Sequence, residues 1–139
     1  MLQQVPLEVL QKSSQNTMVA HVGIEFTEIT PEYVCAKMPV DHRTKQPYGL
    51  LHGGASVVLA ETLGSIAAQL SLTNQNDKAV GLEINANHLK SATSGWVHAK
   101  ATPLRIGKST QVWDIHITND DQELICVSRI TMAIIRAKI

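Results

Sequence analysis

The 139-residue sequence has little of what several large classes of protein depend on. Aromatic residues make up 4% of it, and its 12 basic and 12 acidic residues leave a formal net charge of zero. A neutral chain exerts no general attraction for nucleic acid or an anionic membrane, so we expect neither as a partner. The sequence also lacks the basic start of a signal peptide and the ~18 consecutive apolar residues of a membrane span. We therefore expect a cytoplasmic protein.

Cysteine, metal-ligand and nucleophile motifs are also missing. The two cysteines, Cys35 and Cys126, lie far apart and form no CxxC pair, which excludes a disulfide scaffold and a structural zinc site. The six histidines show no HExxH or other ligand spacing, and no GxSxG motif marks a nucleophilic serine. We therefore expect no metal, no cofactor and no nucleophilic triad.

The composition and the hydrophobic periodicity predict a folded single domain over residues 1–139. Hydrophobic residues make up 44% of the chain and charged residues 17%, which is enough apolar surface to offset the entropy of ordering. A short helix is expected in residues 1–20, beginning after Pro6. Period-two alternation predicts two strands within residues 23–40 and four more at 79–88, 95–104, 110–118 and 124–136. The short joints between the last four strands are of hairpin length.

One strong helical signal covers residues 54–72. At ~1.5 Å per residue this helix is ~28 Å long, most of the ~37 Å width of a domain of this size. Its apolar side chains cover an arc of roughly 220°, against ~100° for an ordinary surface helix; they are Ala55, Val57, Leu59, Ala60, Leu63, Ile66, Ala67 and Leu70. We therefore predict an α+β fold in which an antiparallel sheet of about six strands wraps around one long central helix, with the uncovered flank facing another subunit.

Glu61 is the first candidate for chemistry, because a carboxylate on a largely enclosed helix is costly unless it is solvated, paired or used. Ser65 follows one turn later, so both side chains point the same way and can line one polar cavity. The structural alternatives are a solvated Glu61 and a Ser65 hydroxyl bonded to its own helix.

The run Leu51-His52-Gly53-Gly54 directly before the helix is the second candidate. Two glycines allow close approach to the backbone, and the first N–H groups of a helix are unsatisfied donors at the positive end of its dipole. Together with Gln46 in the preceding loop and Glu61 on the helix, this turn supplies the groups that hydrolysis of an acyl group needs. The alternative is a plain loop-to-helix transition.

A third cluster, of two cations, a glycine and two hydroxyls, comprises Arg105, Ile106, Gly107, Lys108, Ser109 and Thr110. It is not a nucleotide-binding P-loop, because position 102 is threonine and no helix follows. A hairpin tip of this content can hold a phosphate ester through its cations and backbone N–H groups, and a solvated turn is the alternative. Lys90 and Ser91, at the end of an earlier strand, are expected to extend the same surface.

Three segments carry a resemblance to a known family: MPVDHRTKQPYGLLHGGASVVLAETLGS (38–65), VGLEINANHLKS (80–91) and PLRIGKSTQVWDI (103–115). With them, the sequence resembles the hotdog-fold acyl-CoA thioesterases of the 1,4-dihydroxy-2-naphthoyl-CoA and aryl-CoA type, including the phenylacetate-degradation-like enzymes. The resemblance implies an α+β hotdog fold, edge-to-edge dimers that pair into tetramers, and hydrolysis of an acyl-CoA to free acid and coenzyme A. Coenzyme A would be part of the substrate and not a cofactor.

The resemblance also implies roles for individual residues. Glu61 would act as nucleophile or general base, and the Gly53 N–H, assisted by His52, would polarise the thioester oxygen. Gln46 would position the carbonyl or water, and Ser65 the water or leaving thiolate. Contacts to coenzyme A are implied for Gly81, His88, Leu89, Lys90, Ser91, Arg105, Ile106, Gly107, Lys108, Ser109 and Thr110. Many relatives carry arginine where this chain has Lys90, and lysine lacks the bidentate fork of a guanidinium.

Two other functions stay open from the sequence. A hotdog hydratase or dehydratase would act on the acyl chain and leave the thioester intact, and an acyl-CoA-sensing module would bind without turnover. The acyl group also stays open among naphthoyl, benzoyl, phenylacetyl and fatty-acyl groups.

Overall fold

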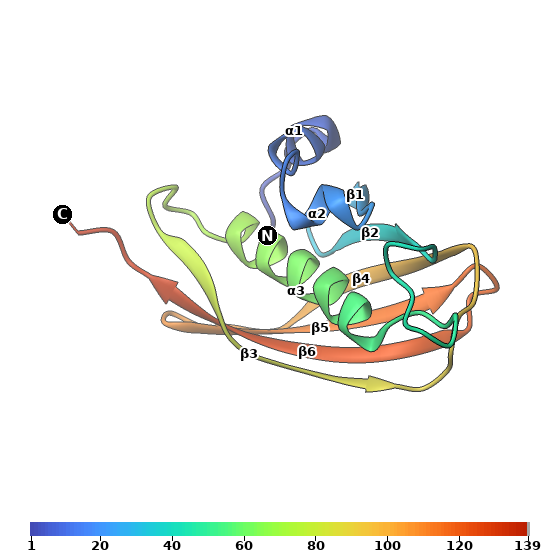
Figure 1. Cartoon of the computed structure of the whole chain (residues 1–139). Coiled ribbons are helices and arrows are strands. Elements are labelled where there is room, and N and C mark those ends of the chain that lie inside the picture. The colour runs from blue at the N-terminus through green and yellow to red at the C-terminus, as the bar shows by residue number, and fades with distance from the viewer. Residues whose placement is uncertain (139) are drawn as a thin grey trace.

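The computed structural model describes residues 1–138 (Figure 1), so Ile139, the last residue of the expected domain, lies outside the described residues. The elements in chain order are α1 (Leu7–Ser13), α2 (Met18–His21), β1 (Glu25–Ile29), β2 (Val34–Pro39), α3 (Gly53–Leu70), β3 (Lys78–His88), β4 (Trp96–Ile106), β5 (Thr110–Asn119) and β6 (Leu124–Ile135). Among the described helices, none combines the length and apolarity needed to cross a membrane.

The six strands form one antiparallel sheet in the order β1-β2-β4-β5-β6-β3. The sheet curves around α3, which lies along its concave face (Figure 1). The core between them is apolar; its largest side chain, Trp113, is fully buried, and its indole N–H donates to Gln111 Oε1 at 2.8 Å. The predicted α+β architecture, with one long helix enclosed by an antiparallel sheet, is confirmed.

The prediction of a hairpin between β3 and β4 was wrong. β3 pairs with β6, so β5 and β6 separate it from β4 in the sheet. The connection must therefore cross three strand spacings, about 14 Å. Residues 89–95, extended at about 3.3 Å each, span about 23 Å, which is enough. Loop length limits how far a connection reaches, but it does not choose the neighbouring strand.

Helix α3 begins at a residue whose side chain caps one of its first N–H groups. His52 is the N-cap, and its Nδ1 accepts a hydrogen bond from Gly54 N at 2.8 Å. The fully buried residues of α3 recur at helical spacing and are Ser56, Leu59, Ala60, Leu63, Gly64, Ala67, Ala68 and Leu70. Ala55, Val57 and Ile66 are only half-buried. The fully buried stripe is thus narrower than the predicted arc, and one flank of α3 stays partly open in the single chain.

The N-terminal segment forms two short helices where the sequence predicted one. Asn16, with φ 62°, reverses the chain between α1 and α2, and Thr17 Oγ1 caps α2 by accepting from Val19 N at 3.2 Å. From α1, the Gln11 amide donates to Ile24 O at 2.9 Å and accepts from Phe26 N at 3.0 Å. This side chain takes the place of a neighbouring strand at the β1 edge of the sheet.

The opposite edge of the sheet, β3, is open. Val80 and Leu82 on this strand are 48% and 62% exposed. A β-bulge interrupts the β3–β6 pairing between Gly81 and Glu83. An exposed edge with apolar side chains is a template for pairing with another chain.

Candidate active site

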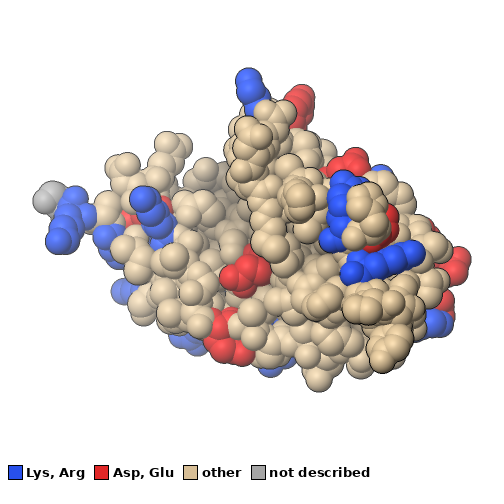
Figure 2. Space-filling view, viewed as in Figure 1, with Lys and Arg blue, Asp and Glu red and all other residues tan. Residues whose placement is uncertain are grey.

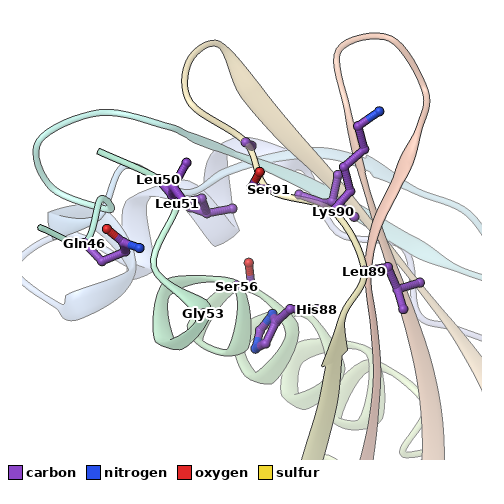
Figure 3. A pocket seen from close by; sticks show the side chains of 11 residues that line it. Gln46, Leu50, Leu51, Gly53, Ser56, His88, Leu89, Lys90 and Ser91 are labelled. Atoms are coloured by element: carbon purple, nitrogen blue, oxygen red, sulfur yellow. The ribbon is translucent and has the colours of Figure 1, made fainter. Parts of the chain in front are cut away.

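A cavity of about 370 Å³ opens at the N-terminal end of α3 (Figure 3). Its walls come from the loop before α3, the first turn of α3 and the segment that follows β3. The lining residues are Gln46, Leu50, Leu51, Gly53, Ser56, His88, Leu89, Lys90, Ser91, Ala92 and Ile125. The walls are largely apolar, with a few polar groups among them, as in sites for small organic ligands.

The end of β3 brings an imidazole against the first turn of α3. A Cβ added at Gly53 would lie 2.8 Å from His88 Nε2, so this glycine lets the ring pack directly against the start of the helix. Figure 3 shows the His88 side chain beside the start of the helix. In the first turn, Gly54 N donates to His52 Nδ1, and the N–H groups of residues 55 and 56 donate to His52 O. The Gly53 N–H is therefore the donor left at the positive end of the helix dipole, beside the imidazole.

Backbone hydrogen bonds hold the loop that carries Gln46. Leu51 N donates to Ala92 O at 2.8 Å, which joins this loop to the segment after β3. His52 N donates to Thr44 O at 2.8 Å, and the buried Thr44 hydroxyl donates to Pro39 O at 2.7 Å. These bonds fix the loop on both sides of Gln46, and Tyr48 N donates to Gln46 Oε1, which holds the side-chain amide at the cavity wall.

Six of the predicted site residues therefore meet at this cavity: Gln46, Gly53, His88, Leu89, Lys90 and Ser91. His52 lies beside it as the helix cap. Sequence reasoning missed Ser56, which is 2% exposed and lines the cavity. The available signal was its spacing, since residue i+3 from Gly53 shares a helix face with it.

Glu61 lies elsewhere in the chain, along with Ser65. It is eight residues beyond Gly53, about 12 Å along the helix axis. The half-buried Glu61 carboxylate lies against β3, with Oε1 3.0 Å from the position that a Cβ on Gly81 would take. This is the bulged part of the open edge, and bulges often accompany functional sites. Within one chain, Glu61 and Ser65 do not line the Gly53 cavity.

The turn formed by residues 105–110 lies at the far end of β4. β4 begins at Trp96, near the cavity, and runs for 11 residues. At about 3.3 Å per residue, its length is about 33 Å. The prediction that Lys90 and Ser91 extend the surface of this turn is therefore wrong for a single chain. The antiparallel crossover between β3 and β4 places the two groups at opposite ends of the sheet.

Lys90 is bound within the chain. Its ammonium forms an ion pair with Glu123, and Asn119 Nδ2 donates to Glu123 Oε1 at 3.0 Å. These contacts, the Lys90 hydrogen bond first, hold the pKa of Glu123 below its ordinary value. In Figure 3 the Lys90 side chain points away from Gly53.

Neither cysteine is among the residues that line the cavity. Burial, aided by the nearby Glu28 carboxylate, raises the pKa of Cys35 to about 11, and burial also raises the pKa of Cys126. Both thiols therefore stay protonated at neutral pH and are poor nucleophiles. Within residues 1–138, no group of three or more His, Cys, Asp or Glu side chains is placed to hold a metal ion.

Comparison with known proteins gives the family of this chain. The sequence profile of the thioesterase superfamily matches residues 48–126, which contain the α3 start, Glu61 and the segment after β3. The chain belongs to the thioesterase superfamily. It is 50% identical to the Escherichia coli 1,4-dihydroxy-2-naphthoyl-CoA hydrolase, over 94% of this chain and 96% of that protein. The thioesterase is therefore an enzyme, as the sequence predicted.

Solved structures confirm the hotdog fold of the thioesterase. A Haemophilus influenzae thioesterase superposes with a TM-score of 0.94 at 48% identity, over 98% of this chain and 96% of that one. A Staphylococcus aureus thioesterase, 40% identical, superposes with a TM-score of 0.82 over 86% of this chain and 98% of that one. Two solved variants of the S. aureus protein carry alanine in place of a glutamate and of a glutamine that lies fifteen positions before it.

Proposed function

We propose that this thioesterase hydrolyses an acyl-coenzyme A to the free acid and coenzyme A, with an aryl acyl group such as 1,4-dihydroxy-2-naphthoyl. The name of the E. coli relative supports this substrate class. The cavity supports it as well, because apolar walls from Leu50, Leu51 and Ile125 suit an apolar acyl group. The observation that carries the proposal is the open first turn of α3, with Gly53 at the cavity.

The Gly53 N–H polarises the thioester carbonyl in this proposal. Negative charge that develops on the oxygen is stabilised by the main-chain donor and by the α3 dipole. His52 assists by shaping the turn, since its Nδ1 holds Gly54 N. Gln46, fixed at the cavity wall, positions the carbonyl oxygen or the attacking water through its amide.

Glu61 supplies the attack. As nucleophile, its carboxylate forms a bond to the carbonyl carbon and the thiolate of coenzyme A leaves; water then hydrolyses the anhydride. As general base, it takes a proton from water, and the hydroxide displaces the thiolate. Ser65, one turn on, places the water or the leaving thiolate. The fifteen-position spacing of Gln46 and Glu61 equals that of the glutamine and glutamate substituted in the S. aureus relative, which supports this pair.

The site requires a second copy of the chain. Because Glu61 lies about 12 Å along the helix from Gly53 of its own chain, we propose that it faces Gly53 of a partner across paired β3 edges. The exposed Val80 and Leu82, and the position of Glu61 at this edge, support a homodimer of this kind. Two such dimers would form the tetramer that the family resemblance implies.

Coenzyme A is held in this proposal by Gly81, by His88, Leu89, Lys90 and Ser91, and by the 105–110 turn. These groups lie up to about 33 Å apart in one chain, so one coenzyme A contacts them on different subunits. Arg105 and Lys108 would bind the nucleotide phosphates. The free thiols of Cys35 and Cys126 fit a reducing cytoplasm, where we place the enzyme.

Release of thiol from a panel of aryl- and fatty-acyl-CoA substrates, followed with a disulfide dye, tests the proposal. We expect Glu61→Ala to abolish turnover and Glu8→Ala, a matched loss of an exposed helical carboxylate on α1, to keep it. More than a few per cent of residual turnover in Glu61→Ala excludes Glu61 as the catalytic group. A product that has gained or lost water with its thioester intact indicates a hydratase or dehydratase, and binding without turnover indicates a sensing module.

A further inference from the structure

Three segments meet at the end of the sheet that lies far from the cavity. β3 begins after Asp77, β6 ends before Arg136, and the 105–110 turn joins β4 to β5. Asp77 is 3% exposed and accepts from Ala137 N at 2.9 Å and from Arg136 Nη1 at 2.7 Å. Arg136 Nη2 donates to the carbonyl oxygen of Lys108. One guanidinium therefore links a buried carboxylate to the turn.

The turn itself is tightly held. Gly107 N donates to Thr110 O at 2.9 Å, and Ser109 O accepts from Ile134 N at 2.9 Å. Arg136 donates to Lys108 O, so the carbonyl oxygens of both Lys108 and Ser109 have fixed partners. A peptide unit is planar and trans, so its C=O and N–H point in opposite directions. Because Arg136 holds Lys108 C=O, the Ser109 N–H is directed away from Arg136.

Cations gather at this end of a chain whose net charge is zero. Figure 2 shows several basic side chains at the end of the molecule where the chain terminates. Lys78, Arg105, Lys108 and Arg136 are all exposed there, beside the buried Asp77. The Ala137 N–H and Arg136 lower the pKa of Asp77, so the carboxylate stays ionised at neutral pH and holds the guanidinium in place.

We propose that Arg136 is a positioning residue for the phosphates of coenzyme A. Held by Asp77, it turns the Lys108 carbonyl away from the bound phosphates and keeps the Ser109 N–H and the Arg105 and Lys108 side chains oriented toward them. A carbonyl oxygen left free to rotate would instead face the phosphate oxygens with like partial charge. This inference rests on the proposed function, because it assumes that the 105–110 turn binds the substrate nucleotide.

The test compares one acyl group carried by coenzyme A and by pantetheine, which has no nucleotide phosphates. We expect Arg136→Ala to raise KM about five- to tenfold for the coenzyme A thioester, as for loss of one ordinary hydrogen bond, with kcat unchanged. KM for the pantetheine thioester should not change. Arg136→Lys keeps the charge with one fewer contact, so we expect a smaller rise. Lys138→Ala is the matched control, since it removes the same charge from the same segment, and it should change KM less than twofold.

The outcomes separate the inference from the proposed function. If Arg105→Ala with Lys108→Ala raises KM for the coenzyme A thioester and Arg136→Ala does not, the positioning role is wrong and the proposed substrate stands. Equal rises for Arg136→Ala and Lys138→Ala show a general charge effect and overturn the positioning role. A rise for both thioesters, or a fall in kcat, shows a merely structural role and also overturns it. If the double variant changes neither KM, the turn does not bind the nucleotide, and both statements about it fall.

Discussion

Replacing Gly53 with alanine tests whether the first turn of α3 and the His88 ring act together at the reacting thioester. The added Cβ would lie 2.8 Å from His88 Nε2 and 3.1 Å from Cε1. Ordinary contacts begin at about 3.4 Å, so the ring must move by at least about 0.6 Å. The backbone itself does not resist the change, because Gly53 has no positive φ and alanine favours helix by up to about 1 kcal/mol over glycine.

The expected loss follows from the size of that movement. A misplacement of about 1 Å at a reacting centre costs about a hundredfold in rate. We therefore expect kcat/KM of Gly53→Ala to fall by roughly ten- to a hundredfold, although the variant keeps the Gly53 N–H donor. The melting temperature should change little, because helix propensity offsets part of the contact strain. Measurement of thiol release beside thermal unfolding separates the two effects.

His88→Ala completes the experiment as a double-mutant cycle. Without the imidazole, the Cβ at position 53 meets no ring, so Gly53→Ala should cost little more in that background. A Gly53→Ala variant with wild-type kcat/KM would falsify the idea that the position of the His88 ring matters at the thioester. A loss that is fully additive with His88→Ala shows instead that the methyl group acts on something other than the ring.

Three further predictions concern stability, assembly and reactivity. Hydrogen bonds from Arg43 lower the pKa of Asp41 in the folded state from 3.8 to about 2. The stabilisation that follows is present above pH 3.8 and is lost as pH falls toward 2. Asp41→Asn should therefore reduce the dependence of the unfolding free energy on pH between 3.8 and 2. Leu82→Arg should yield monomers in light scattering and lose turnover while the secondary structure measured by circular dichroism is retained; an active monomer contradicts the shared site. Cys126, buried with a raised pKa, should not react with a thiol reagent at pH 7 in the folded enzyme, and rapid labelling before unfolding contradicts its burial.

The fold was predictable because its strongest signals are local. The alternation of residues 124–136 and the apolar helix after Gly53 each specify their own element, and one long helix beside six strands leaves few ways to bury both. Strand order was not predictable in the same way. The placement of β3 beside β6 depends on pairing between segments about fifty residues apart, and no loop signal encodes it.

The candidate site was predictable only in part. Gln46 and Gly53 lie close in sequence and meet at one cavity, but the predicted cavity also contained Glu61 and Ser65, which do not line it within one chain. His88 was implied only as a contact to coenzyme A. Ser56 was missed, because its burial depends on tertiary packing that cannot be read from the sequence. The Arg136 contacts were missed as well, since Asp77 and Arg136 are brought together only by the pairing of β3 with β6.

The two edges of the sheet differ in a way that supports the proposed active site between two chains. The β1 edge is occupied by the Gln11 amide, which satisfies a backbone donor and acceptor there. The β3 edge has no such cover and carries Gly81, whose missing side chain leaves room for the Glu61 carboxylate. Because the β1 edge is covered and the β3 edge is open, another chain can extend the sheet only at β3, where Glu61 lies. In the proposed mechanism, catalysis therefore requires association, because Glu61 at the open edge lies about 12 Å along α3 from the Gly53 N–H of its own chain.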